Sequence, residues 1–247
     1  MVLEQRSASV AIIGAGDFIG AAIARKFAAE GFLVFAGRRR ADKLTPLVDA
    51  GEEAGGRIVG RALDARQEDQ LAAFLRDANE VAPLEVCVFN IGANVNFPIL
   101  ETTDRVFRKV WEMACWAGFL TGRESARLML PHGQGNIFFT GATASLRGGS
   151  GFAAFASAKF GLRAVAQSMA RELGPKNIHV AHLIIDSGVD TAWVRERREQ
   201  LWGKEALNNP DLLMPPASVA ASYWQLYQQP RSAWTFELEI RPFGEKW

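Results

Sequence analysis

The chain has 247 residues, of which 49% are hydrophobic and 22% are charged, which is typical of a folded globular protein rather than a disordered one. A formal net charge of +1, with a single short basic run at 38–40, excludes the basic footprint of a nucleic-acid-binding protein. Two cysteines, Cys87 and Cys115, are too few for a disulfide framework and indicate a reducing, cytoplasmic compartment.

Secretory leaders, membrane spans and metal sites are not expected. The first residues, MVLEQRSASVAIIGAG, place acidic and polar side chains before a short apolar run, unlike a signal peptide. No apolar run approaches the ~20 residues of a membrane-spanning helix. The three histidines, His132, His179 and His182, show no metal-ligand spacing and have no carboxylate cluster beside them.

Short apolar runs alternate along the chain with longer segments of helical period. The predicted strands are 9–14, 32–37, 57–64, 84–92, 136–142, 178–185 and 233–240. The predicted helices are 21–31, 42–56, 67–81, 103–129 and 152–174. This alternation indicates right-handed crossovers between parallel strands, with helices on both faces of the sheet. We therefore predict one α/β domain over residues 1–247, with a doubly wound, mostly parallel seven-stranded sheet.

The segment 187–217 interrupts the alternation with Gly188, Pro210, Pro215 and Pro216 and is expected to be irregular. A long insertion after a late strand lies over the carboxyl edge of a parallel sheet, where ligands bind, so we expect this segment to cover a small-molecule substrate. Its aromatic and basic side chains suit an anionic or flat ligand, but an exposed helix has the same composition. These side chains are Trp193, Arg195, Arg197, Arg198 and Trp202.

The first predicted strand ends in a glycine-rich turn, GAGDFIG, at 14–20. Glycines at 14, 16 and 20 let the backbone turn sharply and approach a pyrophosphate that rests on the N-terminus of the following helix. The same spacing occurs in strand–helix turns that bind nothing. The position of this turn, the first between a strand and a helix, favours a dinucleotide-binding domain.

Over nearly its whole length, and less closely after about residue 192, the chain resembles the short-chain dehydrogenase/reductase family, which has a Rossmann-like fold. Gly14, Ile19 and Gly20 match the glycine segment of that family, whereas Ile13 replaces its threonine and Phe18 its middle glycine. Asp64 and the Asn90–Gly92 stretch resemble the residues around the adenosine.

Taken together, the resemblance implies a cofactor site at Gly14, Gly16, Asp17, Phe18, Ile19, Gly20, Arg38, Arg39, Asp64, Ala65, Asn90, Gly92, Lys159, Val189 and Thr191. Thr191 resembles the threonine that holds the nicotinamide carboxamide. Asp186 and Ser187 replace the Pro-Gly pair that precedes it in the family.

The end of the second predicted strand bears on which dinucleotide binds. A carboxylate there binds the ribose 2′-hydroxyl of NAD(H), and an arginine binds the 2′-phosphate of NADP(H). The chain reads FAGRRR, with Gly37 near the place of the carboxylate and Arg38 and Arg39 directly after it. The pattern favours NADP(H) over NAD(H), unless the arginines only form a solvated basic turn.

The family resemblance also implies a catalytic set of serine, tyrosine, lysine and asparagine, in which the tyrosine donates the proton. Lys159 matches the lysine. The family spacings place Phe155 at the tyrosine, Ala142 at the serine and Cys115 at the asparagine. An enoyl-reductase spacing would place the tyrosine at Phe152. We therefore expect a divergent member without the serine and tyrosine, provided that Lys159 is not simply a surface lysine.

Three explanations are compatible with a retained lysine and a missing phenol. The protein could bind NADP and perform no redox chemistry, with a regulatory or partner-binding role. It could reduce an iminium, a pteridine-like ring or an activated alkene, where hydride transfer leaves no alkoxide to protonate. A nearby hydroxyl could supply the proton, the candidates being Thr140, Thr143, Ser145 and Ser157. The leading interpretation is an NADP(H)-dependent oxidoreductase of a small organic substrate.

The long helix predicted at 103–129 bears on assembly. In the family this helix and the lysine-bearing helix form a four-helix dimer interface, so the resemblance implies a homodimer or homotetramer. Trp111 and Trp116 lie on this helix, where each could belong either to that interface or to the core. Cys115, with no base near it in the sequence, is expected to fill a helix face rather than act as a nucleophile.

Overall fold

A seven-stranded sheet forms the centre of the structure, a computed structural model that describes residues 5–245 (for residue 206, the backbone alone). The strands are β1 (Ser9–Ile13), β2 (Leu33–Arg38), β3 (Arg57–Ala62), β4 (Leu84–Phe89), β5 (Gly135–Ala142), β6 (Ile178–Ile185) and β7 (Glu237–Ile240). Their order is β3-β2-β1-β4-β5-β6-β7, and every neighbouring pair is parallel. The doubly wound α/β fold predicted from the sequence is confirmed.

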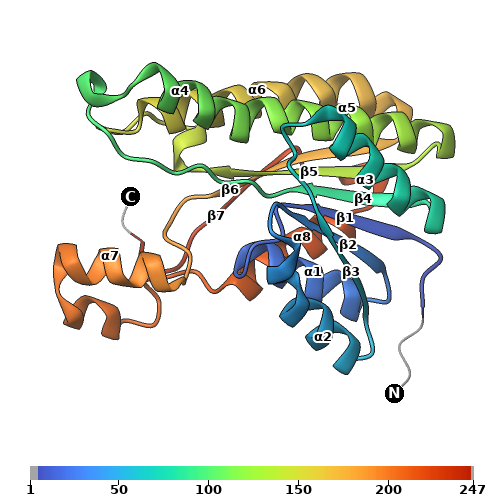
Figure 1. The fold of residues 1–247 in the computed structure, drawn as a ribbon, viewed down its shortest axis with the longest axis horizontal. Helices are drawn as coiled ribbons and strands as arrows, with labels where there is room; N and C mark the ends of the chain where they lie inside the picture. Colours follow the sequence, from blue (N-terminus) through green and yellow to red (C-terminus); the bar gives the residue numbers. More distant parts are fainter. Residues whose placement is uncertain (1–4, 246–247) are drawn as a thin grey trace.

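Helices cover both faces of this sheet (Figure 1). One face carries α1 (Ile19–Ala29), α2 (Thr45–Glu53) and α8 (Pro216–Tyr227), and the other carries α3 (Glu68–Val81), α4 (Asp104–Trp111), α5 (Ala117–Met129) and α6 (Ala153–Leu173). A further helix, α7 (Ala192–Trp202), stands apart from both layers at the lower left of Figure 1. Among residues 5–245, no helix is long and apolar enough to cross a membrane.

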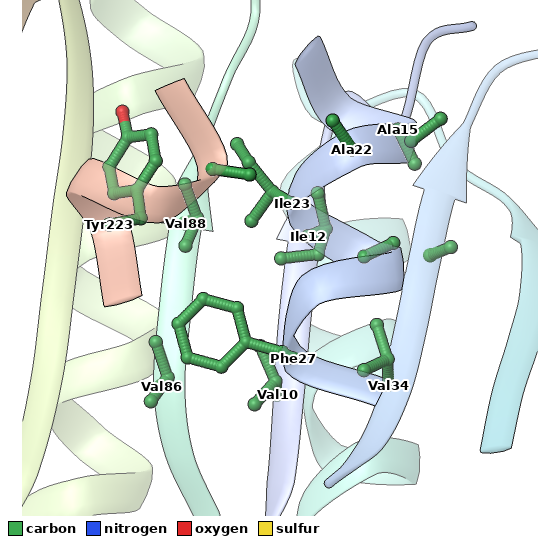
Figure 2. Packing of buried hydrophobic residues seen from close by; sticks show 14 of the residues in the cluster. Val10, Ile12, Ala15, Ala22, Ile23, Phe27, Val34, Val86, Val88 and Tyr223 are labelled. Carbon is green, nitrogen blue, oxygen red and sulfur yellow. The ribbon is translucent and has the colours of Figure 1, made fainter. Parts of the chain in front are cut away.

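Burial on both faces explains the continuous apolar sequences of the central strands. Every residue of β1 and β6 is buried, as expected for parallel strands between two helical layers. Figure 2 shows the layer formed by α1, where Phe27 packs over Val10 and Val86 of the sheet. Burying a large apolar side chain stabilises a fold by roughly 1.5–3 kcal/mol, so these contacts fix α1 and the turn before it.

The long helix predicted at 103–129 forms with one irregularity. A π-helical turn, Glu112–Trp116, lies between α4 and α5 and places Cys115 against the packed face of α6. Thr103 begins α4 by accepting a hydrogen bond from the backbone N–H of Val106 at 3.2 Å. Inserting one residue into a helical turn changes the direction of the following side chains, and no periodicity signal in the sequence reveals it.

The segment 187–217 is not irregular throughout, and this expectation was wrong. Thr191 caps the start of α7, where its hydroxyl accepts a hydrogen bond from the backbone N–H of Val194 at 3.1 Å. Gly203, with a φ of +80°, ends that helix. A parallel bridge between Val189 and Met214 closes the base of this excursion. The segment therefore contains a helix that ends at Gly203, and its three prolines lie beyond that helix.

The C-terminal part differs from the prediction in two further respects. The sequence analysis identified no helix at α8, which Pro216 begins at its first turn. Strand β7 is shorter than predicted, because Arg231–Ala233 forms a 3₁₀ turn and the Gln229 side chain holds Thr235 on both its backbone N–H and its hydroxyl. Glu237 then anchors β7 by a bidentate ion pair with Arg163 of α6, at 2.6 Å.

Candidate functional site

Two cavities meet at the carboxyl ends of β1 and β4, the point at which the strand order reverses. The first has a volume of about 300 Å³ and the second of about 670 Å³, and both are lined by Asn90, Ile91 and Gly92. A shared wall of three residues makes them one elongated site. Ligands of doubly wound sheets bind at such a reversal point.

The glycine-rich turn forms part of the first cavity. Gly14 has a φ of +96°, and a Cβ atom there would lie 2.8 Å from the backbone oxygen of Asn90. The Asn90 amide in turn donates a hydrogen bond to the Gly14 carbonyl at 3.1 Å. Gly16 faces open space, with no heavy atom within 4 Å of the position of its absent Cβ. The turn thus presents bare backbone in front of the N-terminus of α1, which suits a pyrophosphate.

Five cations surround the other end of the first cavity: Arg38, Arg39, Arg40, Lys43 and Arg66. The sequence analysis missed Arg66, which comes from the loop after β3. Arg66 forms a bidentate ion pair with Asp64, at 2.5 and 2.9 Å. That hydrogen bonding is the main reason that the pKa of Asp64 is lowered, and the charge of Arg39 lowers it further. The five cations make this end suitable for a phosphate.

Two of these arginines differ in how they are held. The Arg38 guanidinium donates to Asp17 of the glycine-rich turn at 2.5 Å and to the Lys43 carbonyl at 3.4 Å. Arg39 forms no ion pair with a carboxylate of residues 5–245. Asp17 therefore pairs with Arg38 rather than lining the cavity, and Arg39 is the arginine of this cluster whose charge no carboxylate of residues 5–245 neutralises in an ion pair.

Lys159 lies at the floor of the second cavity. Its side chain leaves α6, is only 2% exposed, and donates to the Thr140 carbonyl at 2.8 Å and to the Ile91 carbonyl at 3.2 Å. Burial lowers the pKa of Lys159 from 10.5 to about 8. The amine lies 6.0 Å from the centre of the Phe155 ring, one helical turn earlier. Lys159 is thus not a surface lysine, and that alternative is wrong.

Two of the three other positions singled out for catalysis share this cavity. Phe155 and Ala142 both line it, on α6 and at the end of β5. Cys115 does not, because its sulfur packs against α6 so closely that a Cβ on Gly161 would lie 2.7 Å from it. Burial raises the pKa of the Cys115 thiol, in keeping with a packing role.

Of the four candidate hydroxyls, only Thr140 and Thr143 line the cavity. Ser145 is fully buried and accepts a hydrogen bond from the backbone N–H of Ala142, and Ser157 donates to the Ala154 carbonyl. The Thr143 hydroxyl donates to the buried carboxylate of Asp186 at 2.6 Å.

Tyr223 of α8 is remote from Lys159 along the chain. In the structure its hydroxyl lies 2.7 Å from that of Thr140. Burial raises the pKa of Tyr223, and its side chain does not line the cavity. Tyr223 therefore holds the Thr140 hydroxyl by a hydrogen bond from outside the cavity.

The structure separates the predicted cofactor residues into two groups. Those that line the two cavities are Gly14, Gly16, Ile19, Arg38, Arg39, Asp64, Ala65, Asn90, Gly92, Lys159, Val189 and Thr191. Asp17, Phe18 and Gly20 do not line them. Among residues 5–245, no group of three or more His, Cys, Asp and Glu side chains could hold a metal ion.

Because Lys159 is buried, we expect the stability of the protein to depend on pH. Between about pH 8 and 10.5 the unfolded chain binds more protons than the folded chain, so the free energy of unfolding rises with pH in this window. Below about pH 8 the amine is protonated in both states, and the folded protein bears the full cost of the buried charge. Relative to the Lys159→Met variant, the free energy of unfolding of the unmodified protein should rise by on the order of 3 kcal/mol between these two pH values.

Urea unfolding curves of both proteins at about pH 7.5 and about pH 10.5 measure this difference. Groups other than Lys159 titrate in both proteins and therefore cancel in the comparison. A difference that is independent of pH would contradict the burial of a charged amine at this position.

Comparison with known proteins places the chain among relatives of the same architecture. The family model described as short chain dehydrogenase matches residues 8–202. A short-chain dehydrogenase from Rhodopseudomonas palustris, known from its crystal structure, is 72% identical, and the match covers 96% of this chain and 100% of that one with a TM-score of 0.85. The short-chain reductase protein NovJ of Streptomyces niveus is 29% identical over 236 residues, which is 95% of this chain and 87% of that protein.

A variant of actinorhodin polyketide ketoreductase, solved with NADPH, is 24% identical and shares the fold with a TM-score of 0.87 over 97% of this chain and 98% of its own. The family model spans most of the chain, including the glycine-rich turn and the helix that carries Lys159. The chain belongs to the short-chain dehydrogenase family.

Proposed function

We propose that the protein is an NADP(H)-dependent oxidoreductase that acts on a small organic substrate in the second cavity. The observation that carries the proposal is the continuity of the site, with a cluster of cations at one end and the buried Lys159 beside the second cavity at the other. Membership of the short-chain dehydrogenase family supports oxidoreduction as the class of reaction.

The residues of the first cavity fit a dinucleotide. The bare backbone at Gly14 and Gly16 suits the pyrophosphate, and Arg38 and Arg39 suit a 2′-phosphate. Lys159 has hydrogen-bond donors that would serve the nicotinamide ribose. When bound, the dinucleotide supplies or accepts a hydride. The likeness to the NADPH-bound ketoreductase concerns the fold, so the choice of NADP(H) rests on the arginines.

The second cavity determines which substrates such a site can reduce. In the positions where the family has its tyrosine and serine, Phe155 and Ala142 offer no hydroxyl to a developing alkoxide. General acid catalysis is usually worth about 10²–10⁴-fold in rate, so simple ketones should be poor substrates. We propose that the natural substrate accepts hydride without needing a protein acid, as an iminium does, or as an activated alkene does when water protonates the carbanion that hydride transfer leaves. Thr143 is the alternative donor, because it lines the cavity beside Ala142.

The first prediction of this proposal concerns the cofactor. Charge-assisted hydrogen bonds contribute roughly 1.5–3 kcal/mol, so NADP⁺ should bind at least about tenfold more tightly than NAD⁺. Arg39→Gln should remove most of that preference while leaving NAD⁺ affinity nearly unchanged. Asp17→Asn should strengthen NADP⁺ binding, because it removes a carboxylate that is paired with Arg38. Isothermal titration calorimetry with both nucleotides measures all three effects.

In this experiment NAD⁺ is the matched control, because it lacks only the 2′-phosphate. Arg195→Gln provides a second control, since that arginine is paired with Asp190 and lines neither cavity. Equal affinities for the two nucleotides, or an equal loss for both in Arg39→Gln, would contradict the assignment of NADP(H).

The second prediction concerns the missing hydroxyls. The double change Ala142→Ser with Phe155→Tyr should raise NADPH-dependent reduction of simple ketones well above either single change. A tyrosine at position 155 lies one helical turn from Lys159, whose charge favours the phenolate and lowers the phenol pKa. NADP⁺ affinity should change little. Because new buried polar groups cost roughly 1–3 kcal/mol when unpaired, thermal melting must confirm that the variants fold.

The starting protein itself provides the control for that series. Ordinary rates of ketone reduction before any change would show that another group already acts as the acid. A folded double variant that binds NADP⁺ but gains no activity on any carbonyl would favour the non-catalytic alternative, an NADP-binding protein with a regulatory or partner-binding role.

We also propose that the protein forms a homodimer or homotetramer. Phe107 and Trp111 of α4 and Phe160 of α6 are exposed large apolar side chains on two helices that pack against each other. A second copy of the same surface would cover them, as closed symmetric assemblies do. Light scattering at micromolar concentration should give a multiple of the 27.0 kDa chain mass, and Trp111→Glu should lower it. A monomeric mass for the unmodified protein would contradict the proposal.

A further inference from the structure

We infer that the second cavity takes a substrate that carries an oxyanion, a carboxylate or a phosphate, on a flat apolar body. The inference rests on the proposed function, because it names the chemical class of substrate for the same cavity. It depends on the charges and the exposed apolar side chains that line this cavity, neither of which hydride transfer requires.

The charges of the lining are all of one sign. Four cations line the cavity, Lys159, Arg147, Arg197 and Arg198, and among residues 5–245 no carboxylate does. Arg198 forms an ion pair with Glu245 at 3.1 Å, and Arg147 forms one with Asp186 at 3.3 Å. Arg197 pairs with no carboxylate of residues 5–245. Its guanidinium lies 5.6 Å from the ring centre of Trp193, which leaves its donors available to an anion.

The apolar part of the lining is exposed on α7. Trp193, Arg197 and Leu201 follow one another at intervals of four residues, as do Val194, Arg198 and Trp202, and all six line the cavity. Trp193, Leu201 and Trp202 are 54%, 60% and 59% exposed. Helix α7 has no buried residue, so this face is not held by packing against the sheet.

A ligand with a flat apolar body would cover these side chains and remove apolar surface from water. Phe152 and Phe155 line the same cavity, so further aromatic contacts are available to such a body. Arg197 lies on the same face of α7 and would bind the oxyanion of that ligand. Apolar side chains together with Arg197 are more selective than either alone, because a neutral apolar ligand leaves Arg197 without a partner.

Helix α7 also provides a matched control. Arg195 is two residues from Arg197, but its guanidinium is neutralised by Asp190 at 2.5 and 2.6 Å, and it does not line the cavity. Changing either arginine to glutamine removes one positive charge from the same helix. Only the change at Arg197 should affect a ligand bound in the cavity.

The test is calorimetric titration of the NADP⁺-saturated chain with 2-naphthoate, 2-naphthyl phosphate and the neutral isostere 2-naphthamide. At least one of the two anions should bind about tenfold or more tightly than the amide. Arg197→Gln should reduce that preference to about twofold or less, and Arg195→Gln should leave it unchanged. The anion that shows the larger preference identifies carboxylate or phosphate as the natural group.

Saturation with NADP⁺ is established first, so a failure of the proposed function is seen separately as a failure to bind the nucleotide. With the nucleotide bound, three results would overturn the inference: 2-naphthamide binding as tightly as both anions, equal effects of Arg197→Gln and Arg195→Gln, or no binding of any naphthalene probe. A loss of NADP⁺ affinity in Arg197→Gln with the anion preference intact would also overturn it, by assigning that arginine to the cofactor.

Discussion

The buried amine of Lys159 is the constraint on which the site depends. A cation that is 2% exposed needs acceptors, and here the acceptors are the carbonyl oxygens of Thr140 and Ile91 at the ends of neighbouring strands. Helix α6 is thereby tied to β5 and to the segment after β4, two of the places where the second cavity meets the sheet. Hydrogen bonds to carbonyls satisfy the amine without neutralising its charge, so the floor of the cavity stays electropositive. Tyr223 and Asn90 hold the hydroxyl of Thr140 and so fix the same strand end from behind.

Under the proposed function, this site would bind the dinucleotide without offering the proton donor that the family resemblance implies. Binding a dinucleotide requires the glycine-rich turn, the arginines after β2 and Lys159, all of which lie along the joined cavities. Protonating an alkoxide would require a hydroxyl near Lys159, whereas Phe155 and Ala142, which line the cavity there, have none. We propose that such a site retains hydride chemistry and favours substrates that do not need an acid, and that the unpaired cation at Arg197 favours substrates with a negative charge.

Local patterns in the sequence were enough to predict the fold, the glycine-rich turn and the position of Lys159, because each depends on residues close together in the chain. The π-helical turn at Glu112–Trp116 and helix α7 were not predicted, since one depends on a single inserted residue and the other on a cap at Thr191 within a stretch dominated by proline and glycine signals. Arg66 and Tyr223 were missed for another reason. Their roles come from side chains that meet only in the folded chain, Arg66 at Asp64 and Tyr223 at Thr140.

We propose that one continuous site holds NADP(H) between the arginines of the first cavity and Lys159, and that Phe155 occupies the position of a proton donor. The most direct measurement is a crystal structure of the chain with NADP⁺. We expect the 2′-phosphate within hydrogen-bond distance of Arg39 and the nicotinamide ribose hydroxyls within hydrogen-bond distance of the Lys159 amine. The Phe155 ring should lie beside the nicotinamide. A nicotinamide ribose bound away from Lys159, or a Phe155 ring that fills the nicotinamide position, would contradict it.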